Sequence, residues 1–174
     1  TVSLALFPET DGASIRALTL TGTVSAGEDS GLAYAAALVG AASGDTAITA
    51  CKTEARLDIA VPGAYVGGLT AVQLDGTLTL TGCAAAGEVS APQAAFTGGL
   101  VGRQEPYSSL TLRNCYQAAD VTGSMEDGLC AGGLIGSVGG DAVLRSCWSA
   151  ASPEDHAASL TAWGKQYRVT GGLS

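Results

Sequence analysis

The amino-acid sequence predicts an all-β protein that folds as a parallel β-helix of about five coils, each of ~32 residues. A cysteine recurs every 32 residues, and a Gly-Gly-Leu segment recurs in phase with it. The cysteines are Cys51, Cys83, Cys115 and Cys147, and the glycine segments begin at Gly67, Gly98, Gly132 and Gly171, with a degenerate copy at Ala36. In addition, no window of about eleven residues has the apolar spacing and caps of a helix. Together these observations predict a solenoid built from strands.

Each repeat contains three segments with the character of short strands. The first ends at the cysteine and alternates apolar with polar residues, as in residues 76–83 and 108–115. The second is the Gly-Gly-Leu segment, whose glycines allow tight bends or a close backbone approach. The third follows the cysteine, at residues 87–91 and 119–123. Three short strands joined by turns rich in Gly, Ser, Asp and Pro describe one coil of a β-helix.

Stacking the repeats assigns each residue to a column. The apolar position three residues before the cysteine is expected to form a buried ladder of Leu20, Ile48, Leu80, Leu112 and Leu144. The leucines of the glycine segments are expected to form a second ladder of Leu38, Leu69, Leu100 and Leu134. The threonines Thr19, Thr79 and Thr111 alternate with the first ladder, so they are expected to face outward. In the first coil, residues 18–28 align with residues 78–88, which puts Thr23 in the cysteine position.

The repeated cysteines are predicted to fill the core at a corner of each coil. They follow a small or polar residue (Gly82, Asn114 or Ser146), and unpaired cysteine is among the most buried residue types. Disulfides between stacked cysteines are an alternative, although in-register parallel side chains have unsuitable Cβ directions. A metal site is a further alternative, but close C-x-x-C spacings are missing and the one histidine is His156. Cys130 lies off the repeat, and the odd total of five leaves at least one thiol free or paired outside the chain.

The chain is expected to be a single domain over residues 1–174, taken from a longer protein. Residues 1–13 are predicted as an N-terminal cap and residues 153–168 as an insertion in the last coil, because the ends of a β-helix expose unpaired edges. Eight basic and sixteen acidic residues give a net charge of −8, which argues against nucleic acid or an anionic membrane surface as a partner. No apolar run reaches the ~20 residues of a membrane span. No cofactor and no metal are expected.

Two pairs of side chains beside the cysteine column are candidates for a binding surface. Arg113 and Arg145 lie two positions before the cysteines, and Tyr116 and Trp148 lie one position after them. Stacking brings each pair together on one flank of the solenoid, and arginine and aromatic residues are enriched in contact hot spots. The alternative is that these residues only pack locally against one another.

A carboxylate column five positions after the cysteines raises the alternative of a carbohydrate-active enzyme. The column is Glu28, Arg56, Glu88, Asp120 and Ser152. Stacking places Glu88 and Asp120 about one strand apart, and paired carboxylates serve glycoside hydrolysis. The simpler interpretation is a solvated edge on which Arg56 offsets the repulsion between the acids. We therefore expect no enzyme activity.

The segments GGLVG (98–102) and LTLRNCYQAADVTG (110–123), and GGLIG (132–136) and VLRSCWSAAS (143–152), resemble the GLUG motif, a short repeat of bacterial cell-surface proteins. The resemblance covers roughly residues 36–150, and it weakens in the first coil and in the last copy. It implies a right-handed β-helix in large secreted or surface-anchored proteins, which include adhesin-like proteins and some immunoglobulin A-cleaving metallopeptidases. The motif carries no catalytic residues.

From the resemblance and the repeat together we expect a non-catalytic, extracellular β-helix module of a bacterial surface protein. Its role would be adhesin-like binding of a host glycan or glycoprotein, or that of a stalk. The alternative is a spacer or exosite domain of a larger secreted peptidase, with the flanking domains of the same polypeptide as its partners.

Overall fold

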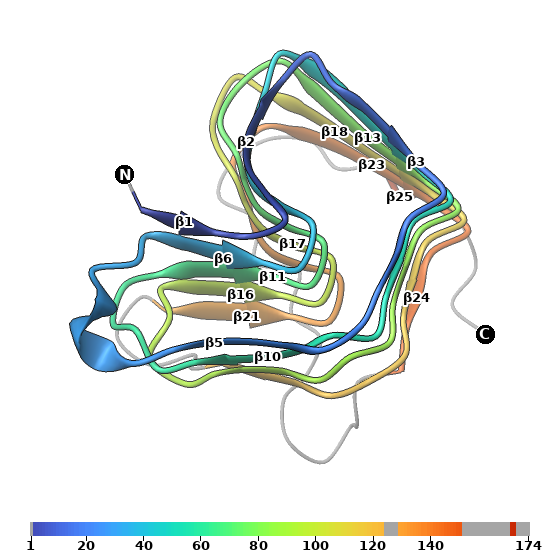
Figure 1. Ribbon diagram of the computed structural model, residues 1–174. Coiled ribbons are helices and arrows are strands. Elements are labelled where there is room, and N and C mark those ends of the chain that lie inside the picture. The colour runs from blue at the N-terminus through green and yellow to red at the C-terminus, as the bar shows by residue number, and fades with distance from the viewer. Residues whose placement is uncertain (1, 124–128, 151–167, 170–174) are drawn as a thin grey trace.

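The computed structural model describes residues 2–123, 129–150 and 168–169, the last two by backbone alone. The chain winds as a right-handed parallel β-helix, as predicted (Figure 1). It completes four turns between β1 and β21 and continues into a fifth, close to the five coils expected. Five parallel sheets run along the stack, and we name them A to E in the order in which one coil visits them.

The strands of each sheet are as follows. Sheet A contains β1 (Ser3–Leu4), β6 (Tyr34–Ala36), β11 (Tyr65–Gly67), β16 (Phe96–Gly98) and β21 (Cys130–Gly132). Sheet B contains β2 (Phe7–Asp11), β7 (Val39–Ser43), β12 (Thr70–Gln73), β17 (Val101–Gln104) and β22 (Ile135–Val138). Sheet C contains β3 (Ser14–Arg16), β8 (Asp45–Thr49), β13 (Thr77–Thr81), β18 (Ser109–Arg113), β23 (Asp141–Arg145) and β25 (Arg168–Val169).

Sheet D contains β4 (Thr19–Leu20), β9 (Lys52–Thr53), β14 (Ala84–Ala85), β19 (Tyr116–Gln117) and β24 (Trp148–Ser149). Sheet E contains β5 (Thr23–Ala26), β10 (Arg56–Ile59), β15 (Val89–Ala91) and β20 (Val121–Gly123). A single turn of 3-10 helix, η1 (Glu28–Ser30), follows β5. No helix in the described part of the chain is long and apolar enough to cross a membrane.

The Gly-Gly-Leu segments form the sharp bend between sheets A and B, which folds into the interior of the cross-section (Figure 1). At Gly98 a side chain would collide with the carbonyl oxygen of Val101, just across the bend. At Gly102 a Cβ atom would lie 2.6 Å from the carbonyl oxygen of Val66, so β17 packs its bare backbone against β11. These glycines are therefore required because two sheets meet at backbone contact distance.

Two apolar clusters fill the solenoid. The larger one contains both predicted leucine ladders and the cysteine column, and the smaller one contains Leu57, Ile59, Val66 and Val89 of sheets A and E. Ile48, Leu80 and Leu112 are fully buried and lie in register, with Leu144 half-buried at the end of the ladder. Leu38, Leu69 and Leu100 are also fully buried, and Leu134 is half-buried. The core is thus built from repeated columns of like residues.

A left-handed residue turns every coil at the corner between sheets C and D. The residues are Ala17, Ala50, Gly82, Asn114 and Ser146, with φ of 55°, 51°, 63°, 52° and 52°. Left-handed backbone is uncommon outside glycine and asparagine, so a column of five such residues shows that the same corner conformation is repeated in every coil. The corner predicted just before each cysteine is therefore present in all five coils.

This corner corrects the predicted alignment of the first coil. Ile15, not Leu20, lies opposite Ile48, and Leu20 lies opposite Thr53. The residue after the left-handed Ala17 is Leu18, so Leu18 and not Thr23 takes the place of the cysteine. The true register differs by five residues from the predicted one. Ile15 stacks on Ile48 and the left-handed Ala17 on the left-handed Ala50, although the LTLTG sequence resembles that of residues 78–82.

Two other first-coil assignments change with that register. Thr19 lies opposite Lys52 rather than in the column of Thr79 and Thr111, which Ser14 begins. Thr23, not Glu28, lies opposite Arg56. Thr79 and Thr111 themselves are half-buried on the outward side of sheet C.

The segment predicted as an N-terminal cap contributes β1 and β2, which continue sheets A and B in the same parallel register. The insertion predicted at residues 153–168 lies outside the described residues except for Arg168, whose backbone belongs to β25 and pairs with β23.

Candidate functional site

The cysteine column lines the inner side of the corner between sheets C and D. Cys51, Cys83 and Cys115 are buried and Cys147 is half-buried, and all of them are free thiols. Each buried thiol donates a hydrogen bond to the preceding coil, as the Cys83 Sγ does to the carbonyl oxygen of Ile48 at 3.3 Å. Cys115 Sγ contacts the carbonyl oxygen of Leu80 at 3.4 Å in the same way. The column is thus part of the packed core.

The thiols of neighbouring coils also contact one another, which affects their ionisation. A hydrogen bond with Cys147 lowers the pKa of Cys115, but the hydrogen bond with Cys83 and burial outweigh it and raise that pKa to about 11. The hydrogen bond with Cys115 and burial raise the pKa of Cys147. Cys115 and Cys147 therefore stay protonated at neutral pH, the form that is poor at metal binding and nucleophilic attack, whereas the hydrogen bond with Cys115 lowers the pKa of Cys83.

Cys130 has a place in the repeat, which the sequence alignment missed. It begins β21 and lies opposite Phe96 in sheet A, where it continues a column of Tyr34, Tyr65 and Phe96. Tyr34, Tyr65 and Phe96 follow one another at intervals of 31 residues, whereas Cys130 follows Phe96 after 34, so its spacing departs from the period.

The outer side of the same corner carries the predicted binding residues, which we call the corner patch: Arg113, Arg145, Tyr116 and Trp148. Arg113 and Arg145 are exposed and lie directly opposite one another in β18 and β23. The rings of Tyr116 and Trp148 stack with centroids 4.9 Å apart and planes inclined by 4°. Trp148 is 52% exposed even so. The structure therefore brings each predicted pair together.

The lysine and arginine side chains differ in whether they have an acidic or hydroxyl side chain as a partner. Six of the eight have described side chains, because Lys165 and Arg168 do not. Lys52 pairs with Glu54, Arg56 with Glu88 and Arg103 with Glu105, while Arg16 donates a hydrogen bond to Ser14. Within the described residues, Arg113 and Arg145 have no such side-chain partner. They therefore lack both the carboxylate partner of Lys52, Arg56 and Arg103 and the hydroxyl partner of Arg16.

A second cluster of arginine and aromatic residues, not predicted from the sequence, lies where sheets A and B diverge; we call it the wedge. It comprises Tyr34, Tyr65, Phe96, Arg103 and Glu105. The Arg103 guanidinium lies 4.3 Å from the Phe96 ring centroid and 5.2 Å from that of Tyr65. The Glu105 carboxylate pairs with this guanidinium, with Oε1 2.7 Å from Nε. An aromatic residue two positions before three of the glycine segments was the sequence signal for this column.

Burial raises the pKa of Tyr34 in the wedge, and the charges of Tyr65 and Glu105 raise it further. Tyr34 and Tyr65 have ring centroids 5.5 Å apart, and Tyr65 meets Phe96 edge to face at 5.0 Å. The wedge is a packed and internally balanced cluster, with Arg103 and Glu105 each about three-quarters buried.

The carboxylate column is only partly as predicted. Arg56 lies beside Glu88, with Nη1 3.5 Å from the carboxylate. Val89 pairs with Val121, so the residues before them, Glu88 and Asp120, occupy corresponding positions in neighbouring coils. Glu28 lies elsewhere and accepts a hydrogen bond from Gln93. Ser152 is outside the described residues.

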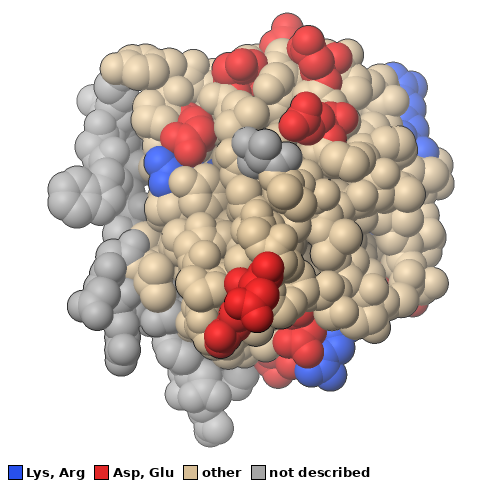
Figure 2. Space-filling model, turned by 60° about the vertical axis from the view of Figure 1, so that its left-hand side comes forward, with Lys and Arg blue, Asp and Glu red and all other residues tan. Residues whose placement is uncertain are grey.

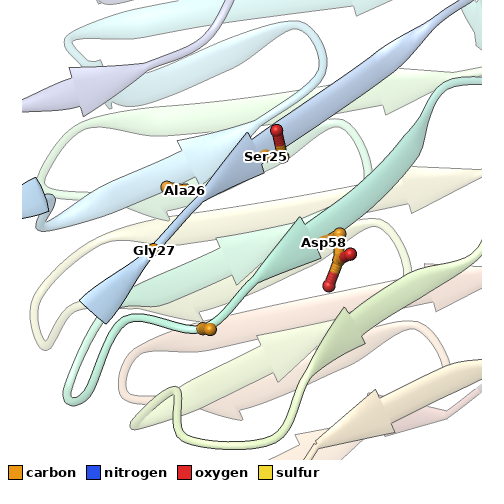
Figure 3. A pocket seen from close by; sticks show the side chains of 5 residues that line it. Ser25, Ala26, Gly27 and Asp58 are labelled. Atoms are coloured by element: carbon orange, nitrogen blue, oxygen red, sulfur yellow. The ribbon is translucent and has the colours of Figure 1, made fainter. Parts of the chain in front are cut away.

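Two surface hollows are lined by few ionisable side chains. One of about 280 Å³ lies over sheet E, where Ser25 of β5 and Asp58 of β10 are neighbours (Figure 3). Another of about 390 Å³ lies over sheet B and includes Glu9, Asp11 and Leu74. Figure 2 shows several separate groups of acidic side chains and few basic ones on an otherwise uncharged face. In the described ranges, no three His, Cys, Asp or Glu side chains are grouped to hold a metal ion.

Comparison with models of known protein families, with curated proteins and with solved structures gave no match for this chain.

Proposed function

We propose that this chain is a non-catalytic, extracellular β-helix module of a bacterial surface protein, and that its corner patch binds a host glycan or glycoprotein. The observation that carries the proposal is the juxtaposition of two unbalanced arginines with an exposed aromatic stack. Arginine and aromatic side chains supply most of the energy in many contact surfaces, because both combine a broad apolar face with hydrogen-bonding groups.

The resemblance to the GLUG motif supports the bacterial surface location, and the fold gives the motif a physical meaning. Its glycines stand where sheets A and B touch through backbone, and its Asn-Cys pair stands at the left-handed corner with the thiol inside. The motif thus specifies how a coil turns, which leaves the outward positions open to variation in sequence. Binding residues are expected among those outward positions.

A spacer or exosite domain of a larger secreted peptidase is the second candidate. It is favoured by the rigidity of a stack in which every coil pairs in register with the next. A carbohydrate-active enzyme is a weaker proposal, because Glu88 is engaged by Arg56 in a surface ion pair. The spacer role requires no ligand on the corner patch.

A glycan array with the purified chain tests the binding role. We expect binding that is lost in the variant carrying Arg145→Ala and Trp148→Ala. Matched controls are Arg56→Ala, on sheet E, and Tyr107→Ala, an aromatic residue that is 96% exposed at the other end of β18. Equal loss in the controls, or no binding by the parent chain to any glycan or serum glycoprotein, contradicts the proposal and favours the spacer role.

A further inference from the structure

We propose that the corner patch selects anionic sugars: the Arg113 and Arg145 guanidinium groups together hold a carboxylate or sulfate, and the exposed Trp148 ring packs on an adjoining sugar ring. This inference rests on the proposed function and names the class of ligand. It depends on the pairing of the two arginines, on the coils in which they occur and on the aromatic stack beside them.

The two guanidinium groups repel one another without compensation from a described side chain. Adjacent strands lie about 4.8 Å apart, and like charges directly opposite on neighbouring strands are destabilising. Every other described lysine or arginine side chain has a carboxylate or hydroxyl partner. A single bound anion between Arg113 and Arg145 would remove the repulsion, and guanidinium groups bind carboxylate and sulfate oxygens in pairs of parallel hydrogen bonds.

The arginine pair and the aromatic pair occur in the same two coils. The arginine column reads Arg16, Thr49, Thr81, Arg113 and Arg145, and the aromatic column reads Thr19, Lys52, Ala84, Tyr116 and Trp148. Packing alone does not require both columns to change together, because the arginine column lies in sheet C before the corner and the aromatic column lies in sheet D after it. Their coincidence in β18–β19 and β23–β24 indicates one composite surface.

The distance between the pairs suits a short saccharide. Arg145 and Trp148 are three residues apart around the left-handed Ser146, so their Cα atoms are separated by at most about 11 Å. Tyr116 covers one face of Trp148, and about half of the Trp148 surface stays exposed for the apolar face of a sugar ring. An acidic group on the same or the next sugar residue would reach the arginines.

The overall charge favours a short anionic ligand over a long polyanion. The chain carries a net charge of −8, which repels nucleic acid at long range. A local anion site on an acidic protein instead acts over contact distance, where screening by salt is weaker than for distant charges. A small acidic sugar therefore fits this surface better than an extended nucleic acid.

Titration calorimetry with three defined probes tests the inference: 3′-sialyllactose, which carries a carboxylate, 3′-sulfolactose, which carries a sulfate, and lactose as the neutral reference. We expect at least one anionic probe to bind tenfold or more tightly than lactose, and the comparison of the two anionic probes shows which acid group is preferred. The variant Arg113→Gln/Arg145→Gln should remove that tenfold preference. The variant Arg113→Lys/Arg145→Lys should keep part of it, because lysine retains the charge without the planar fork. Trp148→Ala should weaken all sugar binding.

The controls separate this inference from the proposed function. Arg56→Gln should leave binding unchanged, and circular dichroism should show that each variant keeps the strand content of the parent. Equal affinity for lactose and the anionic probes, or an unchanged preference in the double glutamine variant, overturns the anionic specificity while glycan binding stands. Failure of the parent chain to bind any glycan overturns both. Arginine-dependent binding of a phosphopeptide or a short DNA in place of every sugar overturns the choice of ligand class.

Discussion

The wedge and the corner patch both combine arginine with a ladder of aromatic rings, yet their surroundings assign them different roles. Arg103 in the wedge is three-quarters buried, lies on two rings and is neutralised by Glu105. Arg113 and Arg145 are exposed, face one another and have no acidic partner among the described residues. Residue type alone therefore does not identify a binding surface. The balance of charge and the degree of burial distinguish the two clusters.

The side chains of the wedge fill space between two sheets, whereas those of the corner patch do not. Sheets A and B diverge from a bend where their backbones touch, and the space beyond the bend is filled by Arg103 and the rings of Tyr65 and Phe96. The corner patch covers an outer convex edge whose inner side is already filled by Cys115 and Leu112. Side chains in the wedge should thus contribute to stability, and those of the corner patch should contribute little.

The largest effect is expected at the bend beneath the wedge. Gly98→Ala places a methyl group on the Val101 carbonyl, so we expect it to lower the free energy of unfolding by about 3 kcal/mol or more. Gly27→Ala is the matched control, because nothing lies within 4 Å of its Cβ position and its φ is −89°. Urea unfolding followed by circular dichroism measures both. A Gly98→Ala variant as stable as Gly27→Ala would mean that the two sheets do not meet as described.

A smaller contrast is expected between the two aromatic ladders. Tyr65→Ala removes contacts with Tyr34, Phe96 and Arg103, and we expect a loss of about 2 kcal/mol. Trp148→Ala removes a half-exposed ring with one stacking partner, for which about 1 kcal/mol is expected. The same unfolding experiment compares them, and a larger loss for Trp148 would reverse the assignment of structural and functional ladders.

A smaller effect, which depends on pH, is expected on the free energy of unfolding from the cysteines on the inner side of the corner. An unfolded cysteine ionises near its ordinary pKa of about 8.5, whereas Cys115 in the fold keeps its proton up to a pKa of about 11. The unfolded state therefore binds fewer protons between these values, so the free energy of unfolding should fall as pH rises from 9 to 11 and stay level below pH 8. Thermal unfolding across this range should show a shallower fall for Cys115→Ala. An identical slope in that variant would assign the alkaline loss to other groups, such as Tyr34 in the wedge.

The sequence was sufficient to predict the fold, because its two markers report stacking directly: a buried cysteine and a glycine bend at a constant interval. It also placed the pairs Arg113/Arg145 and Tyr116/Trp148 correctly, since in-register coils bring residues 32 apart together. The first coil was misaligned because Leu18–Gly22 repeats the letters of Leu78–Gly82 in a different register. Stacking at Ile15 and the backbone at Ala17 decide that register, and neither has a distinctive letter pattern.

The wedge was missed for a related reason. Its members come from strands that are adjacent only because the coil bends sharply inward at each Gly-Gly-Leu segment, and a repeat predicts columns without predicting the shape of one coil. The spacing of Tyr34, Tyr65 and Phe96 was visible, but their contact with Arg103 required the angle between sheets A and B.

The most direct test of the contrast between the two clusters is the free energy of unfolding of two variants measured side by side, Arg103→Gln and Arg113→Gln/Arg145→Gln. The first loses a largely buried ion pair and two cation–π contacts, so we expect a loss of about 1–2 kcal/mol. The second removes two exposed like charges and should change stability by less than about 0.5 kcal/mol, or increase it slightly. A double glutamine variant that loses more stability than Arg103→Gln would show that the paired arginines hold the fold together, and would contradict their assignment to binding.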